Sequence, residues 1–182
     1  MERIMTEIPL PSPAGMDSET IRFVTGRCPM GAVLVAVSER GLCAVLFGDD
    51  PSALLADLRA RFPHAQITEG NAETQTMLSD VVRMIEAPAS KLDQPLDARG
   101  TPFQYLVWQA LREIPAGTTV SYGSIAKRIG RPKEAKDVAE ACAANPLAVV
   151  IPCHRVVKAD GSISGYRWGV RRKRALLAHE AA

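Results

Sequence analysis

The chain has 182 residues, which is enough for one large domain or two small ones with a buried core. Its hydrophobic content of 47% and charged content of 23% are ordinary for a soluble globular protein. No apolar stretch approaches the roughly 20 residues that a helix needs to cross a bilayer. This composition excludes a disordered chain and a helical membrane protein, and we expect a cytoplasmic protein.

The formal net charge of +2 hides a division between two halves of the chain. Residues 1–100 hold 9 Lys and Arg against 14 Asp and Glu, a net charge of −5, and residues 101–182 hold 13 against 6, a net charge of +7. A basic second half favours a polyanionic partner, with nucleic acid as the leading candidate. The alternative at this point is a basic surface that binds nothing.

The first 22 residues contain Pro9, Pro11 and Pro13 and lack the apolar core of a signal peptide, so we expect a flexible leader. Elsewhere the four cysteines form no CxxC pair, and the chain has only three histidines, which gives a zinc site little support. In a reducing cytosol the cysteines are expected to be free thiols. They are Cys28, Cys43, Cys142 and Cys153.

Residues 23–98 predict an α/β domain without a recognisable chemical motif. Two runs rich in β-forming residues, 31–37 and 42–47, are separated by a short polar turn and predict a hairpin. Asp49 to Ser52 predict the start of a helix that ends near Arg61, and a second helix is expected over 72–86. Residues 88–100 read as a connection, in which Leu92 and Leu96 are expected to form a short strand.

Residues 99–182 predict a helical domain. Thr101 and Pro102 start a helix with apolar residues at helical spacing, and residues 118–120 read as extended. Ser121 is a good N-cap for a helix over 122–129, which Gly130 ends. A further helix is expected from Pro132 to about Ala143. Two short helices joined by a glycine turn, in a basic region, have the outline of a helix-turn-helix.

The apolar run 147–151 is expected to be a buried strand that leads into Pro152-Cys153-His154-Arg155-Val156. The thiolate of a cysteine is a strong nucleophile, and a nearby base or positive charge increases the thiolate fraction. Taken alone, the motif also fits a buried structural cysteine beside a solvated His-Arg pair. A candidate nucleophile within about 20 residues of a DNA-reading outline favours the reactive interpretation.

These residues match a known family. Residues 101–182 closely resemble the C-terminal domain of O6-alkylguanine-DNA alkyltransferases, especially the Ada-type bacterial proteins, and the acidic half resembles that family's N-terminal domain. The resemblance implies a ribonuclease H-like α/β domain with a small sheet and helices, followed by an α-helical, winged-helix-like helix-turn-helix domain. The matching segments are 121–122, 144–146, 151–157, 164–166 and 177–180.

The resemblance also implies a role for five residues. Cys153 matches the acceptor of the alkyl group, and the stable thioether that forms limits each molecule to one turnover. His154 matches the residue that deprotonates the thiol through a water, and Glu180 matches the carboxylate that orients this histidine. Tyr122 matches the proton donor to the departing guanine, and Asn145 matches a hinge asparagine.

The implied partner is double-stranded DNA that carries O6-alkylguanine, bound in the minor groove with the damaged base flipped out. A monomer is expected, with no membrane partner, cofactor or metal. Lys136 stands where the family has an arginine that fills the gap left by the base, and we expect slower or weaker flipping. The alternative is that Lys133 or Arg131 replaces this arginine functionally. Trp168 is expected to narrow the pocket. The remaining expected substrate or DNA contacts are Lys133, Arg155, Val156, Tyr166, Arg167 and Ser121.

Three other functions compete with repair. A protein that flags damage without repair lacks the acceptor cysteine, whereas this chain has Cys153. A transcriptional regulator of the Ada type needs a cysteine cluster in a zinc domain, which is missing from this sequence. A cysteine hydrolase would leave the helix-turn-helix and the basic half without a purpose. The sequence leaves activity on O4-alkylthymine open.

Overall fold

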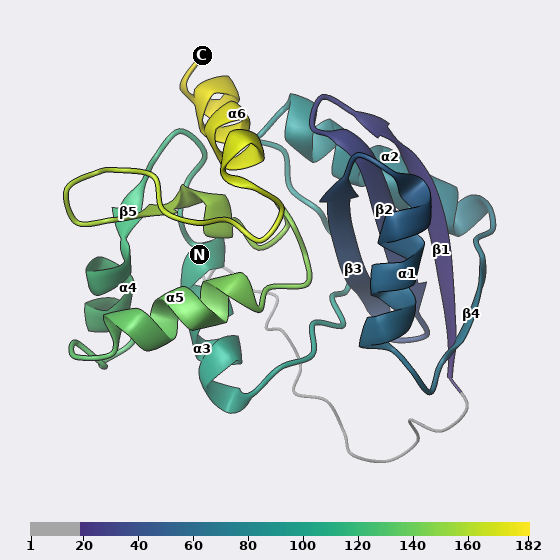
Figure 1. Ribbon diagram of the computed structural model, residues 1–182, viewed down its shortest axis with the longest axis horizontal. Helices are drawn as coiled ribbons and strands as arrows, with labels where there is room; N and C mark the ends of the chain where they lie inside the picture. Colours follow the sequence, from purple (N-terminus) through teal and green to yellow (C-terminus); the bar gives the residue numbers. More distant parts are fainter. Residues whose placement is uncertain (1–18) are drawn as a thin grey trace, which may run out of the picture.

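A computed structural model describes residues 19–182, which form two domains side by side (Figure 1). The N-terminal domain holds a four-stranded sheet in the order β3-β2-β1-β4, with α1 in front of the sheet and α2 behind it in Figure 1. Strand β4 pairs in parallel with β1, whereas the other neighbours are antiparallel. The elements are β1 (Thr20–Cys28), β2 (Gly31–Ser38), β3 (Gly41–Gly48), α1 (Pro51–Arg61), β4 (Gln66–Glu69) and α2 (Ala72–Glu86).

Two helices cover the sheet, so β2 and β3 are buried along nearly their whole length and are continuous hydrophobic runs. The hairpin and both helices expected from the sequence are confirmed. Strands β1 and β4 were not predicted, because their apolar residues are sparse and part of β1 lies at residues 20–22, within the expected leader. The rest of that leader, residues 1–18, lies outside the described residues.

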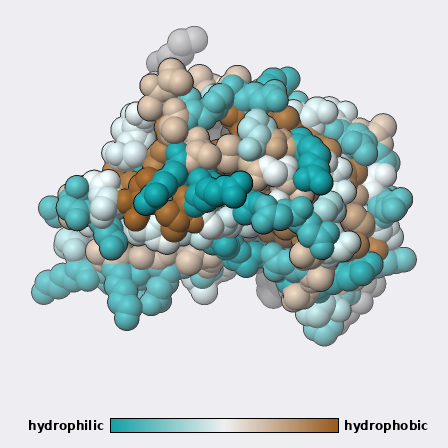
Figure 2. Space-filling view, turned by 45° about the horizontal axis from the view of Figure 1, so that its top comes forward, coloured by the Kyte–Doolittle hydropathy of each residue, from teal (hydrophilic) through white to brown (hydrophobic). Residues whose placement is uncertain are grey.

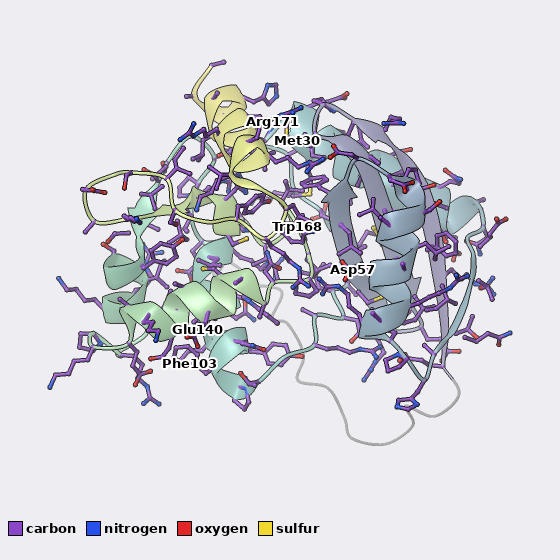
Figure 3. All side chains as sticks on the ribbon, viewed as in Figure 1. Met30, Asp57, Phe103, Glu140, Trp168 and Arg171 are labelled. Atoms are coloured by element: carbon purple, nitrogen blue, oxygen red, sulfur yellow. The ribbon has the colours of Figure 1, made fainter. Side chains whose placement is uncertain are left out.

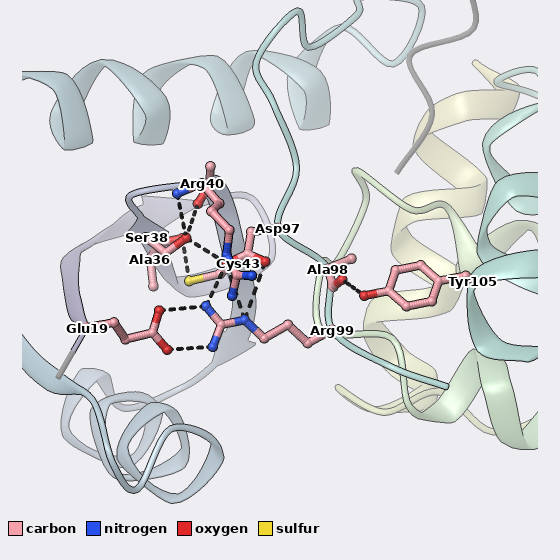
Figure 4. Close-up of polar contacts among 10 residues, drawn as sticks. Glu19, Ala36, Ser38, Arg40, Cys43, Asp97, Ala98, Arg99 and Tyr105 are labelled. Carbon is pink, nitrogen blue, oxygen red and sulfur yellow. Dashed lines mark hydrogen bonds and ion pairs between the residues drawn. The ribbon is translucent and has the colours of Figure 1, made fainter. Parts of the chain in front are cut away.

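The connection between the domains is held by ion pairs (Figure 4). The guanidinium of Arg99 donates to both carboxylate oxygens of Glu19, at 2.6 and 2.8 Å, and also to Asp97. One turn into the next helix, the Tyr105 hydroxyl donates to the Ala98 carbonyl. The short strand expected around Leu92 and Leu96 is wrong: Leu96 forms a single bridge to β3, and the rest of residues 88–100 is irregular.

The C-terminal domain is mainly helical. Helix α3 begins with a capping box in which Thr101 and Gln104 bond reciprocally, and the Ser121 side chain caps α4 as expected. Gly130 ends α4 at φ 76°, a left-handed conformation that favours glycine. The elements are α3 (Pro102–Arg112), β5 (Val120–Ser121), α4 (Tyr122–Arg128), α5 (Ala135–Ala143), the 3₁₀ turn η1 (Cys153–Arg155), β6 (Val156–Val157) and α6 (Val170–Ala181).

Two expectations for this domain are wrong. Helix α5 begins at Ala135 and not at Pro132, because residues 131–134 form a turn before it. The run 147–151 is buried but is not a strand: Leu147 makes one bridge, and the chain then turns through Val149, whose φ is +61°. A β-branched residue is rare in this conformation, so the turn must be held from outside.

The outer edge of β3 holds this turning segment against the N-terminal domain. Val45 donates its N–H to the Pro146 carbonyl at 2.9 Å and accepts from the Ala148 N–H at 3.1 Å. Nearby, the ring of Phe47 packs edge-on against Trp168, with 6.1 Å between centroids. The segment that leads to Cys153 is therefore fixed by contacts from both domains.

Hydrophilic residues cover much of the visible face, and hydrophobic residues gather in limited patches (Figure 2). Leu106 and Val170 are the large hydrophobic residues that stand exposed in the described part of the chain. Among residues 19–182, no helix has the length and apolar character to cross a membrane.

Candidate active site

Asn145 organises the turn that presents Cys153. The fully buried Asn145 side chain accepts from the Leu147 N–H at 2.9 Å and donates to the Ile151 carbonyl at 2.8 Å. These bonds close the loop around Val149 and give the φ of +61° its support. The same amide nitrogen lies 3.2 Å from the Cys153 sulfur. One side chain therefore shapes the backbone and provides a hydrogen-bond donor to the thiol.

Glu180 reaches the site from the last turn of α6. Its carboxylate lies 2.7 Å from Nε2 of His154 and accepts from two nitrogens of the Arg155 guanidinium, Nε and Nη2, and from the Gly117 N–H. The side chains of His154, Arg155 and Glu180 are largely buried, and the Glu180 side chain is only 4% exposed. A buried carboxylate without these partners would be costly, so the loss of either His154 or Arg155 is expected to destabilise the fold.

The electrostatics of this cluster set the state of His154. Burial by itself raises the pKa of Glu180, but the bonds from His154 and Arg155 outweigh it and bring that pKa down to about 2. Burial lowers the pKa of His154, against the pull of Glu180, so the imidazole is neutral near pH 7. An ionised carboxylate only accepts, which places the histidine proton on Nε2.

This tautomer leaves Nδ1 of His154 as a free base. Nδ1 is buried and has no hydrogen-bond partner among residues 19–182. An unpaired acceptor beside a cysteine is the arrangement that a general base needs, either directly or through one water. The base–orienter half of the expected arrangement is therefore present in the geometry.

The Cys153 thiol is 3% exposed and its pKa is raised, chiefly by burial. The hydrogen bond from Asn145 and the positive charge of Lys173 oppose this shift. The thiol is thus protonated at rest near pH 7 and must lose its proton in order to react. The reaction of Cys153 therefore requires a base that takes the proton of the thiol.

A cavity of about 740 Å³ opens above the thiol. Its volume lies in the range of about 300–1,000 Å³ that is usual for small-molecule sites. The parallel pairing of β5 with β6 brings the start of α4 beside η1, which places Tyr122 in the wall. Five expected residues line the cavity together: Tyr122, Lys136, Cys153, Tyr166 and Arg167.

Several expected contacts lie elsewhere. The prediction that Arg155 contacts substrate or DNA is wrong, because its guanidinium is directed inward to Glu180 and the Ile114 carbonyl. Val156 is buried, and its carbonyl accepts from Lys173. Lys133 is exposed in the turn before α5, outside the residues that line the cavity.

Trp168 lies behind the cavity wall and not in it. Its ring packs edge-on against Tyr166 at 5.3 Å on one side and against Phe47 on the other, at the boundary between the domains (Figure 3). Arg172 reinforces this boundary by donating to the carbonyls of Met30 and Trp168. Any narrowing of the pocket by Trp168 therefore acts through the position of Tyr166.

Sequence reasoning missed Lys173 and several residues of the cavity wall. Lys173 is 1% exposed, and the spacing of Lys173, Leu176 and Glu180 places them on one face of α6 over two turns. An apolar residue flanked by two charges at this spacing was the available signal, but it normally indicates a solvated helix face. The missed wall residues include Cys142, Lys158 and Ser164.

Comparison with known families decides which class of protein has this site. The model for the 6-O-methylguanine DNA methyltransferase ribonuclease-like domain matches residues 21–88. The model for the DNA binding domain of the same methyltransferases matches residues 102–182. The chain belongs to the 6-O-methylguanine DNA methyltransferase family.

Individual members agree with this assignment. The bifunctional transcriptional activator/DNA repair enzyme Ada of Escherichia coli is 49% identical over 167 residues, which is 92% of this chain and 47% of that protein. A methylated-DNA–protein-cysteine methyltransferase of Methanosarcina acetivorans is 35% identical over 85% of this chain and 94% of its own. The chain spans about half the length of most of the curated relatives that it matches best.

The fold of the family is shared over both domains. The crystal structure of Mycobacterium tuberculosis OGT in complex with DNA has 34% sequence identity and a TM-score of 0.74, over 88% of this chain and 92% of that one. The expected fold, a ribonuclease-like α/β domain followed by a helical DNA-binding domain, is confirmed. Among the described residues, no group of three or more His, Cys, Asp and Glu side chains is arranged to hold a metal ion.

Proposed function

We propose that this chain repairs DNA by transferring the alkyl group of O6-alkylguanine to Cys153 in a single turnover. The observation that carries this proposal is a buried thiol in the wall of a cavity of about 740 Å³ that Tyr122 also lines, next in the chain to a neutral histidine held by the carboxylate of Glu180. The family assignment supports the same reaction, since its members are methyltransferases that act on 6-O-methylguanine in DNA.

The arrangement of these residues supports the following steps. Nδ1 of His154 takes the proton of Cys153 through one water, and Glu180 stabilises the imidazolium that forms. The thiolate attacks the alkyl carbon; a bond from sulfur to carbon forms, and the bond from carbon to O6 breaks. Guanine leaves with the electron pair and takes a proton from Tyr122. The product thioether has no leaving group that water could displace readily, so the site is consumed.

DNA reaches the site by base flipping. The target base must leave the helix to enter the cavity, at a cost of a few kcal/mol that is lower for a weakened pair. Helix α5 contributes Lys136 to the cavity from its first turn. Arg167, which also lines the cavity, donates to the carbonyl of Ala143 at the last residue of α5. The net charge of +7 in residues 101–182 supports binding to the phosphate backbone. We propose that α5 enters the minor groove, where little sequence is read.

The test is intact-protein mass spectrometry after incubation with a duplex that carries one O6-methylguanine. The proposal predicts a gain of one methyl group per molecule, located at Cys153 by peptide mapping and lost in Cys153→Ala. Cys28→Ala, which removes a thiol in the distant sheet, should gain the methyl group like the wild type. Tight binding to the duplex without any methyl gain would instead favour a protein that flags damage.

We also propose O4-alkylthymine as a second substrate class. Thymine is smaller than guanine, so the cavity that admits the purine has room for the pyrimidine, although Tyr122 is then less well placed for the leaving group. The same assay with a duplex carrying O4-methylthymine should give slower methyl gain. A complete lack of gain would restrict the reaction to guanine.

A further inference from the structure

The hydroxyl of Tyr122 has a protein partner that alkyl transfer itself does not require. It forms a hydrogen bond with the hydroxyl of Ser164, which lies in the loop between β6 and α6 and also lines the cavity. Either oxygen can be the donor in such a pair. Which one donates determines whether the phenol proton points toward Ser164 or into the cavity.

Lys173 lies behind this pair. Its Nζ has three acceptors for its three protons: the Val156 carbonyl at 2.6 Å, the Gly165 carbonyl at 3.4 Å and the Ser164 hydroxyl at 3.5 Å. In the described part of the chain no carboxylate forms an ion pair with this buried ammonium. The same Nζ lies 5.9 Å from the centroid of the Tyr122 ring.

The direction of the hydrogen bonds follows from the chemistry of the ammonium group. An ammonium has only donors, so the Ser164 oxygen must accept from Lys173. The hydroxyl proton of Ser164 is then free to be donated, and Tyr122 is its acceptor in the described residues. A tyrosine oxygen that accepts from Ser164 directs its own proton elsewhere, and the open side of Tyr122 is the cavity.

We propose that Ser164 and Lys173 are positioning residues that direct the phenol proton of Tyr122 into the cavity. The inference rests on the proposed function, in which Tyr122 gives this proton to the departing guanine. When the proton leaves, the phenolate keeps the hydrogen bond from Ser164 and lies near the ammonium of Lys173. Guanine gains the proton that Tyr122 loses, so the step is balanced without any further group.

The test is the single-turnover rate of methyl transfer with the full chain and saturating O6-methylguanine duplex, beside the dissociation constant for the same duplex. Ser164→Ala should slow transfer by about tenfold, a fraction of the roughly 10²–10⁴-fold that positioned proton donors contribute, and should leave the dissociation constant unchanged. Ser164→Thr keeps a hydroxyl and should restore most of the rate. Ser162→Ala, in the same loop but bonded to Asp160, is the matched control and should behave like the wild type.

A double-mutant cycle with Tyr122→Phe separates positioning from a general effect on the loop. If Ser164 acts through Tyr122, then Ser164→Ala should change the rate of the Tyr122→Phe protein by less than about twofold. An equal slowing in both backgrounds would overturn the inference, and so would a wild-type rate in Ser164→Ala. A wild-type protein that transfers no methyl group at all would refute the proposed function instead, which keeps the two failures distinct.

Discussion

Two residues of α6, Glu180 and Lys173, are buried near Cys153 in different electrostatic surroundings. On one side, Glu180 of α6 is bonded by His154 and Arg155, and every charge has a partner. On the other side, Lys173 of the same helix donates only to neutral oxygens. We call the Glu180 side compensated, because its charges are paired, and the Lys173 side uncompensated. The compensated side fixes the tautomer of His154. On the uncompensated side, the positive charge of Lys173 opposes the rise that burial causes in the pKa of the Cys153 thiol, and it lies 5.9 Å from the centroid of the Tyr122 ring.

The difference shows why the two sides tolerate change differently. A cluster of paired charges is stable but fails as a unit when one member is lost, because an unpaired charge stays buried. A lone ammonium bonded to carbonyls is costly to bury but acts over a longer range. The account therefore predicts effects on folding and rate for the first side and mainly on rate for the second.

The largest effect is expected where both sides meet, at Asn145. Asn145→Ala leaves the Leu147 N–H and the Ile151 carbonyl without their partners. The free energy of unfolding should fall by about 3 kcal/mol, and transfer should slow by at least about 100-fold because the nucleophile is misplaced. Urea unfolding and single-turnover assays measure the two effects. Asn71→Ala, a helix N-cap in the other domain, should cost only about 1 kcal/mol and leave transfer intact.

Glu180→Gln should break the compensated side alone. The pKa of Glu180 is held at about 2, below its ordinary 4.5, so its stabilising contribution is present above about pH 4.5 and is lost as the pH falls toward 2. That shift corresponds to about 3 kcal/mol at neutral pH. Thermal unfolding should therefore show a loss of stability at pH 7 and a flatter profile than the wild type between pH 5 and 2. Parallel profiles for the two proteins would contradict the assigned ion pair.

The smallest expected effect concerns the entrance of the cavity. Lys136→Arg restores a planar guanidinium that can stack in the space left by the flipped base. The transfer rate should rise by about threefold, whereas the dependence of binding on salt should not change, because the charge is the same. Stopped-flow transfer and binding at several salt concentrations provide the two readouts. A steeper salt dependence would mean that residue 136 contacts a phosphate instead.

Much of the fold and of the nucleophile's side could be predicted from the sequence. Helix caps such as Thr101 and Ser121, and the hairpin of β2 and β3, depend on local residues and are found where local rules place them. The position of Glu180 beside His154 required the family resemblance, since 26 residues separate them in the chain.

The remaining features depend on contacts that no local pattern encodes. The turn at Val149 exists because Asn145 and the edge of β3 hold it, although its apolar run reads as a strand. Arg155 belongs to the signature motif, but Glu180 draws it inward and away from the cavity. Lys173 reads as one more charge on a basic helix, and only the packing of α6 against η1 shows that it is buried.

The most direct test of the account is a cycle of single-turnover rates for the wild type, His154→Gln, Tyr122→Phe and the double variant, with bound O6-methylguanine duplex. The account assigns His154 to the thiol and Tyr122 to the departing guanine. The two rate losses should therefore multiply in the double variant to within about threefold. A double variant no slower than the slower single variant would show that both residues serve the same proton transfer, and would contradict the separation of the two sides.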